Sequence, residues 1–217
     1  AIFQKKIIFN DLGLIIIDEQ HKFGVSQRKK LSDKGGINCD ILLMTATPIP
    51  RTLTMSIYGD MDISIIQEKP KSRIQTKTYS KLENNIGDVI NFVKKEIKFG
   101  NQVFWVCPLI EESKKIDHAS AVQKFEYLKK IFPNQVSMLH GKTNIEKKDI
   151  ILNAFLEKKF KILVSTTIIE VGIDFPNANV IIIENANKFG LSQLHQLRGR
   201  VGRGNKASTC ILLFKSN

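Results

Sequence analysis

Short apolar runs alternate along the chain with longer stretches in which apolar residues recur at the helical period. The runs lack the strict alternation of apolar and polar positions that marks a strand with one exposed face. In one of the longer stretches, 83–99, a single side of a helix would carry Ile86, Val89, Ile90, Val93 and Ile97. Apolar strands separated by helices predict an α/β fold, a parallel sheet with helices on both faces.

The pattern assigns most of the chain to strands, helices and one break. The predicted strands are 14–18, 41–45, 63–66, 75–79, 103–106, 136–139, 162–165, 180–183 and 208–213. The predicted helices are 83–99, 119–132, 144–156 and 191–197. A polar, basic segment around Pro70 interrupts the pattern, because proline limits regular structure. We therefore expect a domain over 1–66 with an incomplete sheet, a linker over 67–78 and a second domain over 79–217.

Composition narrows the class of protein. The 217-residue chain has 33 Lys and Arg residues against 21 Asp and Glu residues, a net charge of +12. This charge favours a polyanionic partner, and a lysine-rich solvated surface is the alternative. A hydrophobic fraction of 42% excludes a disordered or collagen-like chain. No run approaches the ~20 apolar residues of a membrane span. Cys39, Cys107 and Cys210 lack metal-type spacing, so we expect the reducing cytosol and no membrane.

Two polar motifs follow the first predicted strands, at the edge where parallel sheets bind ligands. In the first, DEQH, Asp18 is suited to hold Mg²⁺ and Glu19 to activate a water molecule, although a plain acidic turn is the alternative. In the second, TATPIPRT, the hydroxyls of Thr45 and Thr47 could relay a change at a phosphate to a neighbouring domain. Helix capping by Thr47 is the alternative.

A third motif, STTIIEVGIDFP, follows the predicted strand 162–165. The hydroxyls and backbone N–H groups of Thr166 and Thr167 suit a nucleic-acid phosphate. Gly172 permits close backbone approach, and Asp174 is available to a ribose hydroxyl or an arginine. An ordinary loop between a strand and a helix is the alternative.

The fourth motif, QLHQLRGRVGRG, combines arginine with glycine. Arg200 and Arg203 are three residues apart and would share one face of a helix. Glycines cost helix stability, so their presence indicates that the backbone or a guanidinium approaches something closely. A guanidinium there could stabilise a transferring phosphoryl group, and a solvated basic helix is the alternative.

In this order, DEQH, TATPIPRT, TTIIEVGID and QLRGRVGR resemble motifs II, III, V and VI of superfamily 2 helicases. The longer segments DEQHKFGVSQR, VFWVCPLIEES, LHGK and IENANKFGLSQLHQLRGRVGRG resemble the RecG family of bacterial ATP-dependent branched-DNA helicases. The transcription-repair coupling translocases share some of these segments, but YGDMD and VCPLIEES favour RecG. The resemblance covers essentially the whole chain and implies two RecA-like domains of the P-loop NTPase type, the first incomplete.

The resemblance also implies a role for each matching residue. Asp18 and Glu19 would be the Mg²⁺-associated and water-activating carboxylates, and Arg200 and Arg203 would face the phosphates of ATP. The other nucleotide-binding residues would be Gln20, His21, Gly172, Asp174 and Gln196. The residues that couple nucleotide to DNA would be Thr45, Ala46 and Thr47. The DNA-binding residues would be Thr166 and Thr167. Independently of the resemblance, the positive charge of the basic linker makes Arg73 and Lys77 candidate DNA contacts.

The implied activity is ATP-driven remodelling of branched or duplex DNA, at stalled forks and Holliday-type junctions in repair and recombination. The implied protein is a monomer of the bacterial cytoplasm, associated with the nucleoid. Lys22 replaces the arginine expected from the family, and the sequence contains no GxxxxGK[ST] P-loop. With the P-loop, the wedge domain and the translocation hairpin expected to be missing, we predict a fragment that is inactive alone. A non-catalytic DNA-binding remnant and part of a coupling translocase remain the alternatives.

Overall fold

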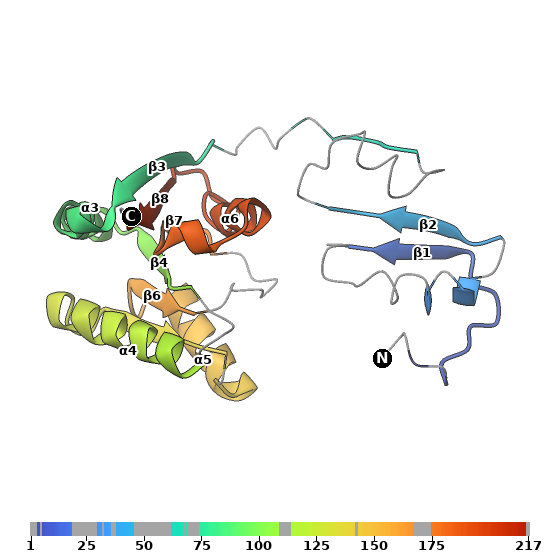
Figure 1. Cartoon of the computed structure of the whole chain (residues 1–217), viewed down its shortest axis with the longest axis horizontal. Coiled ribbons are helices and arrows are strands. Elements are labelled where there is room, and N and C mark those ends of the chain that lie inside the picture. Colours follow the sequence, from blue (N-terminus) through green and yellow to red (C-terminus); the bar gives the residue numbers. More distant parts are fainter. Residues whose placement is uncertain are drawn as a thin grey trace. The chain divides into compact units, whose positions relative to one another are not determined.

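The computed structural model describes residues 4, 6–18, 30–31, 33–35, 38–45, 62–66, 68, 74–108, 114–141, 143–166 and 175–215, without the side chains of 114–120. The chain divides into two compact units, Ala1–Ile65 and Ile66–Asn217 (Figure 1). Each unit has its own sheet and its own core, and each is described by itself below.

The first unit contains a parallel pair of strands, β1 (Leu14–Ile17) and β2 (Asp40–Leu43). One face of this pair forms a small core around Ile15, Ile17 and Leu31. The predicted strand 63–66 is wrong, since these residues have no regular structure. Ile65 and Ile66 are 75% and 92% exposed. An apolar run by itself therefore does not place these residues in a buried strand.

The second unit is built on a six-stranded sheet in the order β3-β8-β7-β4-β6-β5, in which every neighbouring pair is parallel. Its strands are β3 (Lys77–Leu82), β4 (Gln102–Val106), β5 (Val136–Leu139), β6 (Ile162–Ser165), β7 (Ala178–Ile183) and β8 (Thr209–Phe214). The predicted parallel α/β fold is confirmed. Lys77 and Thr78, which were assigned to the linker, instead begin β3 and pair with Thr209 and Cys210.

The helices of the second unit connect these parallel strands. They are α3 (Ile86–Lys98), which follows a 3₁₀ turn at Glu83–Asn85, α4 (Lys114–Ile131), α5 (Ile145–Leu156) and α6 (Leu191–Arg198). A second 3₁₀ turn, Ala186–Lys188, precedes α6. The α5 helix begins where the Asn144 side chain accepts a hydrogen bond from the N–H of Glu146 (2.8 Å), a standard N-cap.

Both faces of this sheet are buried, because successive side chains of each strand point to opposite faces. In β4, Val103 and Trp105 pack in the core cluster that includes α3 and α4 residues. Phe104 and Val106 pack in a second cluster with residues of α5 and α6. Every residue of β4 and β7 is buried, which explains why these strands read as continuous apolar runs.

Candidate functional site

The first predicted motifs lie at one edge of the small sheet in the first unit. Asp18 directly follows β1 and is exposed, and Thr45 follows β2 by two residues. Because the strands are parallel and the N–H of Met44 bonds to the carbonyl of Ile17 (2.8 Å), Asp18 and Thr45 lie at the same carboxyl edge. An exposed carboxylate at this edge fits Mg²⁺, which prefers oxygen ligands and keeps several of its water molecules.

Several of the predicted residues of these motifs lie outside the described part of the chain: Glu19, Gln20, His21, Ala46 and Thr47. Within the described ranges, no three His, Cys, Asp or Glu side chains gather as they would around a metal ion. The Mg²⁺ site at Asp18 stays a prediction.

At the carboxyl edge of the large sheet, backbone bonds join the residues that follow the central strands. The N–H of Cys107 donates to the carbonyl of Ser165 (2.8 Å), and the N–H of Glu184 donates to the carbonyl of Val106 (2.9 Å). Thr166 is buried and follows β6, and its N–H points to the carbonyl of Leu139 (3.4 Å). Thr166 therefore lies where the sequence placed it, while Thr167, Gly172 and Asp174 lie outside the described residues.

A buried acidic residue at this edge was missed by the sequence reasoning. Glu184 Oε1 accepts a hydrogen bond from Trp105 Nε1 (2.9 Å) and pairs with Lys124 Nζ (2.7 Å). The Cys107 thiol lies 3.7 Å from Glu184 Oε2, and burial together with this negative charge raises the pKa of Cys107 well above its usual range. The available signal was an acidic residue directly after an apolar strand, the same signal that singled out Asp18.

The GKT sequence after β5 lacks the upstream glycine of a GxxxxGK[ST] P-loop. The N–H of His140 bonds to Thr143 Oγ1 (3.1 Å), and the N–H of Thr143 bonds to the carbonyl of His140 (2.9 Å). These bonds close a short turn that leads directly into α5.

The arginine motif does not form the predicted helical face. Helix α6 ends at Arg198, where the N–H of Gly199 bonds to the carbonyl of His195 (3.0 Å), so Arg200 and Arg203 follow the helix in a loop. We call residues 199–204 the arginine loop. The glycine at the C-cap, Gly199, favours this end because glycine disfavours helix. Farther along the loop, Gly202 has a φ of +73°, a left-handed conformation.

The two arginines differ in exposure. Arg200 is half-buried, whereas Arg203 is exposed and its Nε donates to the carbonyl of Gly199 (3.2 Å). Between them, Val201 is fully buried in the core cluster of α5 and α6 and anchors the loop. Gln196, on α6, is half-buried.

The arginine loop lies at the amino ends of the neighbouring strands. A Cβ on Gly202 would meet the hydroxyls of Ser208 and Thr76, and one on Gly204 would lie 2.7 Å from the carbonyl of Pro176. Ser208 and Thr76 directly precede β8 and β3, and Pro176 lies two residues before the start of β7. Arg200 and Arg203 therefore lie at the opposite ends of the strands from Thr166, whereas the end of the third motif, at Pro176, packs against Gly204 of the fourth.

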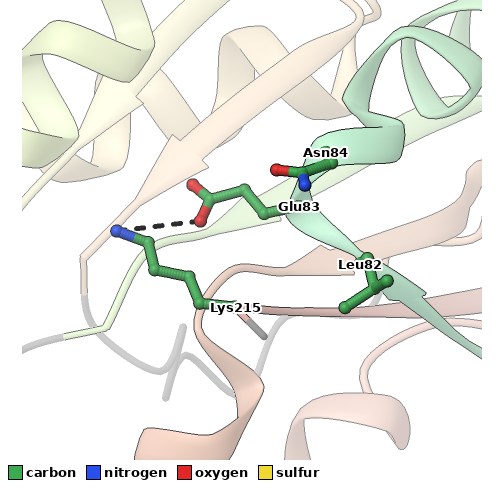
Figure 2. Close-up of a pocket in the computed structure, with 4 residues that line it drawn as sticks. All are labelled: Leu82, Glu83, Asn84 and Lys215. Carbon is green, nitrogen blue, oxygen red and sulfur yellow. Dashed lines mark ion pairs between the residues drawn. The ribbon is translucent and has the colours of Figure 1, made fainter. Parts of the chain in front are cut away.

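The predicted DNA contacts of the linker have different outcomes. Arg73 lies outside the described residues, and Lys77 is exposed at the start of the edge strand β3. One pocket lies at the far end of β3, lined by Leu82, Glu83, Asn84 and Lys215 (Figure 2). Lys215 Nζ is 3.7 Å from Glu83 Oε2 across it. None of the site residues predicted from the sequence lines this pocket.

The comparison with known families decides the assignment. Residues 84–205 match the family model described as the helicase conserved C-terminal domain. The chain belongs to this helicase family. The matched range runs from the turn before α3 to the end of the arginine loop. In the described part of the chain, no helix is long and apolar enough to cross a membrane.

Individual relatives confirm the resemblance to RecG. The chain is 49% identical to the ATP-dependent DNA helicase RecG of Thermotoga maritima over 215 residues, 98% of this chain and 27% of the relative. It is 48% identical to RecG of Bacillus subtilis, covering 98% of this chain and 31% of the relative. The chain thus spans about a third or less of the length of these relatives.

Solved structures agree on the fold. A structure of RecG bound to a three-way DNA junction matches 98% of this chain, and the chain covers 27% of it, with 43% identity and a TM-score of 0.71. Yeast Dbp5 bound to RNA and ADP BeF3 matches 94% of this chain, and the chain covers 54% of it, with a TM-score of 0.64. Its identity of 18% shows the shared fold alone.

Proposed function

We propose that this chain is motor machinery of an ATP-dependent DNA helicase of the RecG kind. The observation that carries the proposal is the match, at 43% identity over 98% of this chain, to a RecG that is bound to a three-way DNA junction. The substrate would be branched or duplex DNA at stalled forks and Holliday-type junctions, in repair and recombination. The protein would act as a monomer in the bacterial cytoplasm, at the nucleoid.

Residues of the polar and arginine motifs would hold the nucleotide. ATP with Mg²⁺ would supply the phosphoryl transfer whose free energy drives movement on DNA. Asp18 would hold the metal, and Glu19 would orient the attacking water. Arg200 and Arg203 would place positive charge against the phosphates. The remaining nucleotide contacts would come from Gln20, His21, Gly172, Asp174 and Gln196.

The DNA would be held by hydroxyls and by positive charge. Thr166 and Thr167 would bind backbone phosphates after β6, while Arg73 and Lys77 would add cations before and at the start of β3. Thr45, Ala46 and Thr47 would pass a change at the nucleotide to these contacts. A net charge of +12 supports binding that weakens steeply with salt, because each neutralised phosphate releases counterions.

We further propose that the 217 residues alone do not turn over ATP. The P-loop backbone and its lysine cradle the β- and γ-phosphates, and the sequence contains no GxxxxGK[ST]. A DNA-stimulated ATPase assay on the isolated chain is expected to give the buffer rate. Turnover above that rate that co-purifies with the chain would overturn this proposal.

The activity is tested in a chimera in which this chain replaces the matching 27% of the Thermotoga maritima relative. We expect DNA-stimulated ATP hydrolysis and unwinding of a three-way junction. Arg200→Ala should lower the rate of hydrolysis at least about 1,000-fold, the effect of removing an arginine that stabilises the transferring phosphoryl group. Lys98→Ala, at an exposed cation of α3, is the matched control and should leave the rate unchanged.

Two outcomes of this experiment would contradict the proposal. Full ATPase activity of the Arg200→Ala variant would show that the arginine loop does not act at the nucleotide site. A chimera that binds DNA in a salt-dependent way, with no turnover and no response to ATP, would instead support the non-catalytic DNA-binding alternative.

A further inference from the structure

The arginine loop is held in place by a pair of hydroxyl groups from distant parts of the sequence. Thr76 Oγ1 and Ser208 Oγ lie 2.8 Å apart and form a hydrogen bond. Gly202 packs directly on this pair, since a Cβ there would be 3.1 Å from Thr76 Oγ1 and would collide with Ser208 Oγ. Only a residue without a side chain fits so close to the two hydroxyls. The φ of +73° at position 202 also favours glycine. We call Thr76 and Ser208 the hydroxyl pair.

The hydroxyl pair joins two segments that the backbone also holds together. The N–H of Lys77 donates to the carbonyl of Ser208 (3.0 Å), and Lys77 is paired with Thr209 at the start of the β3–β8 ladder. Ser208 is 2% exposed, so its hydroxyl depends on a protein partner for its hydrogen bond. Thr76 is therefore fixed to the segment that leads from the arginine loop into β8.

The position of Thr76 in the chain determines which segments this contact joins. Thr76 directly precedes β3, the first strand of the second unit, and it follows the basic segment that separates the two sheets in the sequence. The chain that comes from the first unit thus reaches the arginine loop before it reaches the sheet. A displacement of Thr76 would act on Gly202 through the hydroxyl pair.

We propose that Thr76 and Ser208 are positioning residues for Arg200 and Arg203, and that they tie the start of β3 to the arginine loop. This inference rests on the proposed role of the two arginines at the phosphates of ATP. Neither hydroxyl touches the nucleotide in this scheme. Their effect is exerted through Gly202, while buried Val201 keeps the loop attached to the core when the hydroxyl pair is broken.

The first test measures hydrogen exchange in the 217-residue chain. Thr76→Val and Ser208→Ala each remove one hydroxyl, and each should speed exchange of the arginine-loop amides roughly 2- to 10-fold, the worth of one neutral hydrogen bond. The double variant should be no faster than either single one, because both remove the same bond. Thr76→Ser keeps a hydroxyl and should restore the slow exchange.

Thr78→Val is the matched control, since Thr78 lies in β3 with an exposed side chain. It should leave exchange in the loop unchanged. The proposal is wrong if Thr76→Val exchanges like Thr78→Val, or if Thr76→Ser fails to restore the loop. It is also wrong if Thr76→Val loosens β4 and β7 as much as the loop, because the pair would then only support the fold.

The second test measures ATP hydrolysis by the chimera described above. Thr76→Val and Ser208→Ala should lower kcat on the order of 10-fold to 100-fold, as expected when a group that acts on the phosphates is displaced by up to ~1 Å. The dissociation constant for DNA should stay the same. Unchanged kcat in both variants would overturn the proposal. If the unmodified chimera has no turnover, the proposed function fails, while the exchange experiment still decides whether the hydroxyl pair holds the loop.

Discussion

Replacing Gly202 with alanine should destabilise the second unit far more than the same change at another left-handed glycine. Gly202 has a φ of +73° and Gly100, just after α3, has a φ of +81°. Both positions impose the same backbone strain on alanine. Only Gly202 is crowded, because an added Cβ would meet the Thr76 and Ser208 hydroxyls, whereas nothing lies within 4 Å of a Cβ on Gly100.

The expected magnitudes follow from these two contributions. A left-handed conformation costs an L-residue roughly 1–2 kcal/mol relative to glycine. Forcing an extra carbon into a packed site costs a further ~1–3 kcal/mol. We therefore expect Gly202→Ala to lower the free energy of unfolding by about 2–5 kcal/mol, and Gly100→Ala by about 1–2 kcal/mol. Against a typical total of about 5–15 kcal/mol, the first loss is large.

Urea unfolding followed by tryptophan fluorescence measures this difference. Trp105 is the single tryptophan of the chain, it is fully buried in the second unit, and its indole N–H is bonded to Glu184, so its emission reports unfolding of that unit. Equal destabilisation by Gly202→Ala and Gly100→Ala would refute the reasoning. Adding Ser208→Ala to Gly202→Ala should recover part of the loss, since it removes the colliding oxygen but leaves the Ser208 Cβ at 3.2 Å.

Three further predictions use the same protein. Lys124→Met leaves the Glu184 carboxylate, at 9% exposure, without its cation and should cost about 3–5 kcal/mol in urea unfolding, whereas Lys159→Met, at an exposed ion pair, should cost less than about 1 kcal/mol. Burial raises the pKa of Cys210 from 9.0 to about 11, so the unfolded thiol ionises first. Stability should therefore fall by up to about 2–3 kcal/mol as pH rises from 9 to 11, and Cys210→Ala should reduce this slope. A thiol reagent should label half-buried Cys39 before buried Cys107 and Cys210, and labelling of all three at one rate would contradict the burial.

The buried strands could be predicted from the sequence because they are apolar on both faces. The fully buried strand at 162–165 is found with the predicted bounds, and so is the half-buried edge strand at 136–139. The edge strand β3 was predicted at 75–79 but begins at Lys77 and runs to Leu82, because its sequence KTYSKL is mostly exposed and hydropathy gives it a weak signal. The prediction at 63–66 failed for the opposite reason. This run is apolar, but it has no strand partner among the described residues.

The candidate site residues could be predicted from the sequence, but their arrangement in the fold could not. A spacing of three places Arg200 and Arg203 on one helical face only while the helix continues, and the glycines end it at Arg198. Glu184 resembles an ordinary turn residue until Trp105 and Lys124 are seen beside it. A contact such as that between Thr76 and Ser208 joins positions 132 residues apart, and no local pattern encodes it.

The pairing of β3 with β8 also determines how the second unit would carry a mechanical load. The two strands are parallel neighbours, in register from Lys77 with Thr209 to Leu82 with Phe214. Tension applied between the segment before β3 and the segment after β8 would pull the strands past each other along their length. Because the ladder bonds of a parallel pair are evenly spaced, all of them would share that tension at once instead of opening one after another. Such a pull would thus load the β3–β8 pair in shear, which resists separation more strongly than a peeling geometry does.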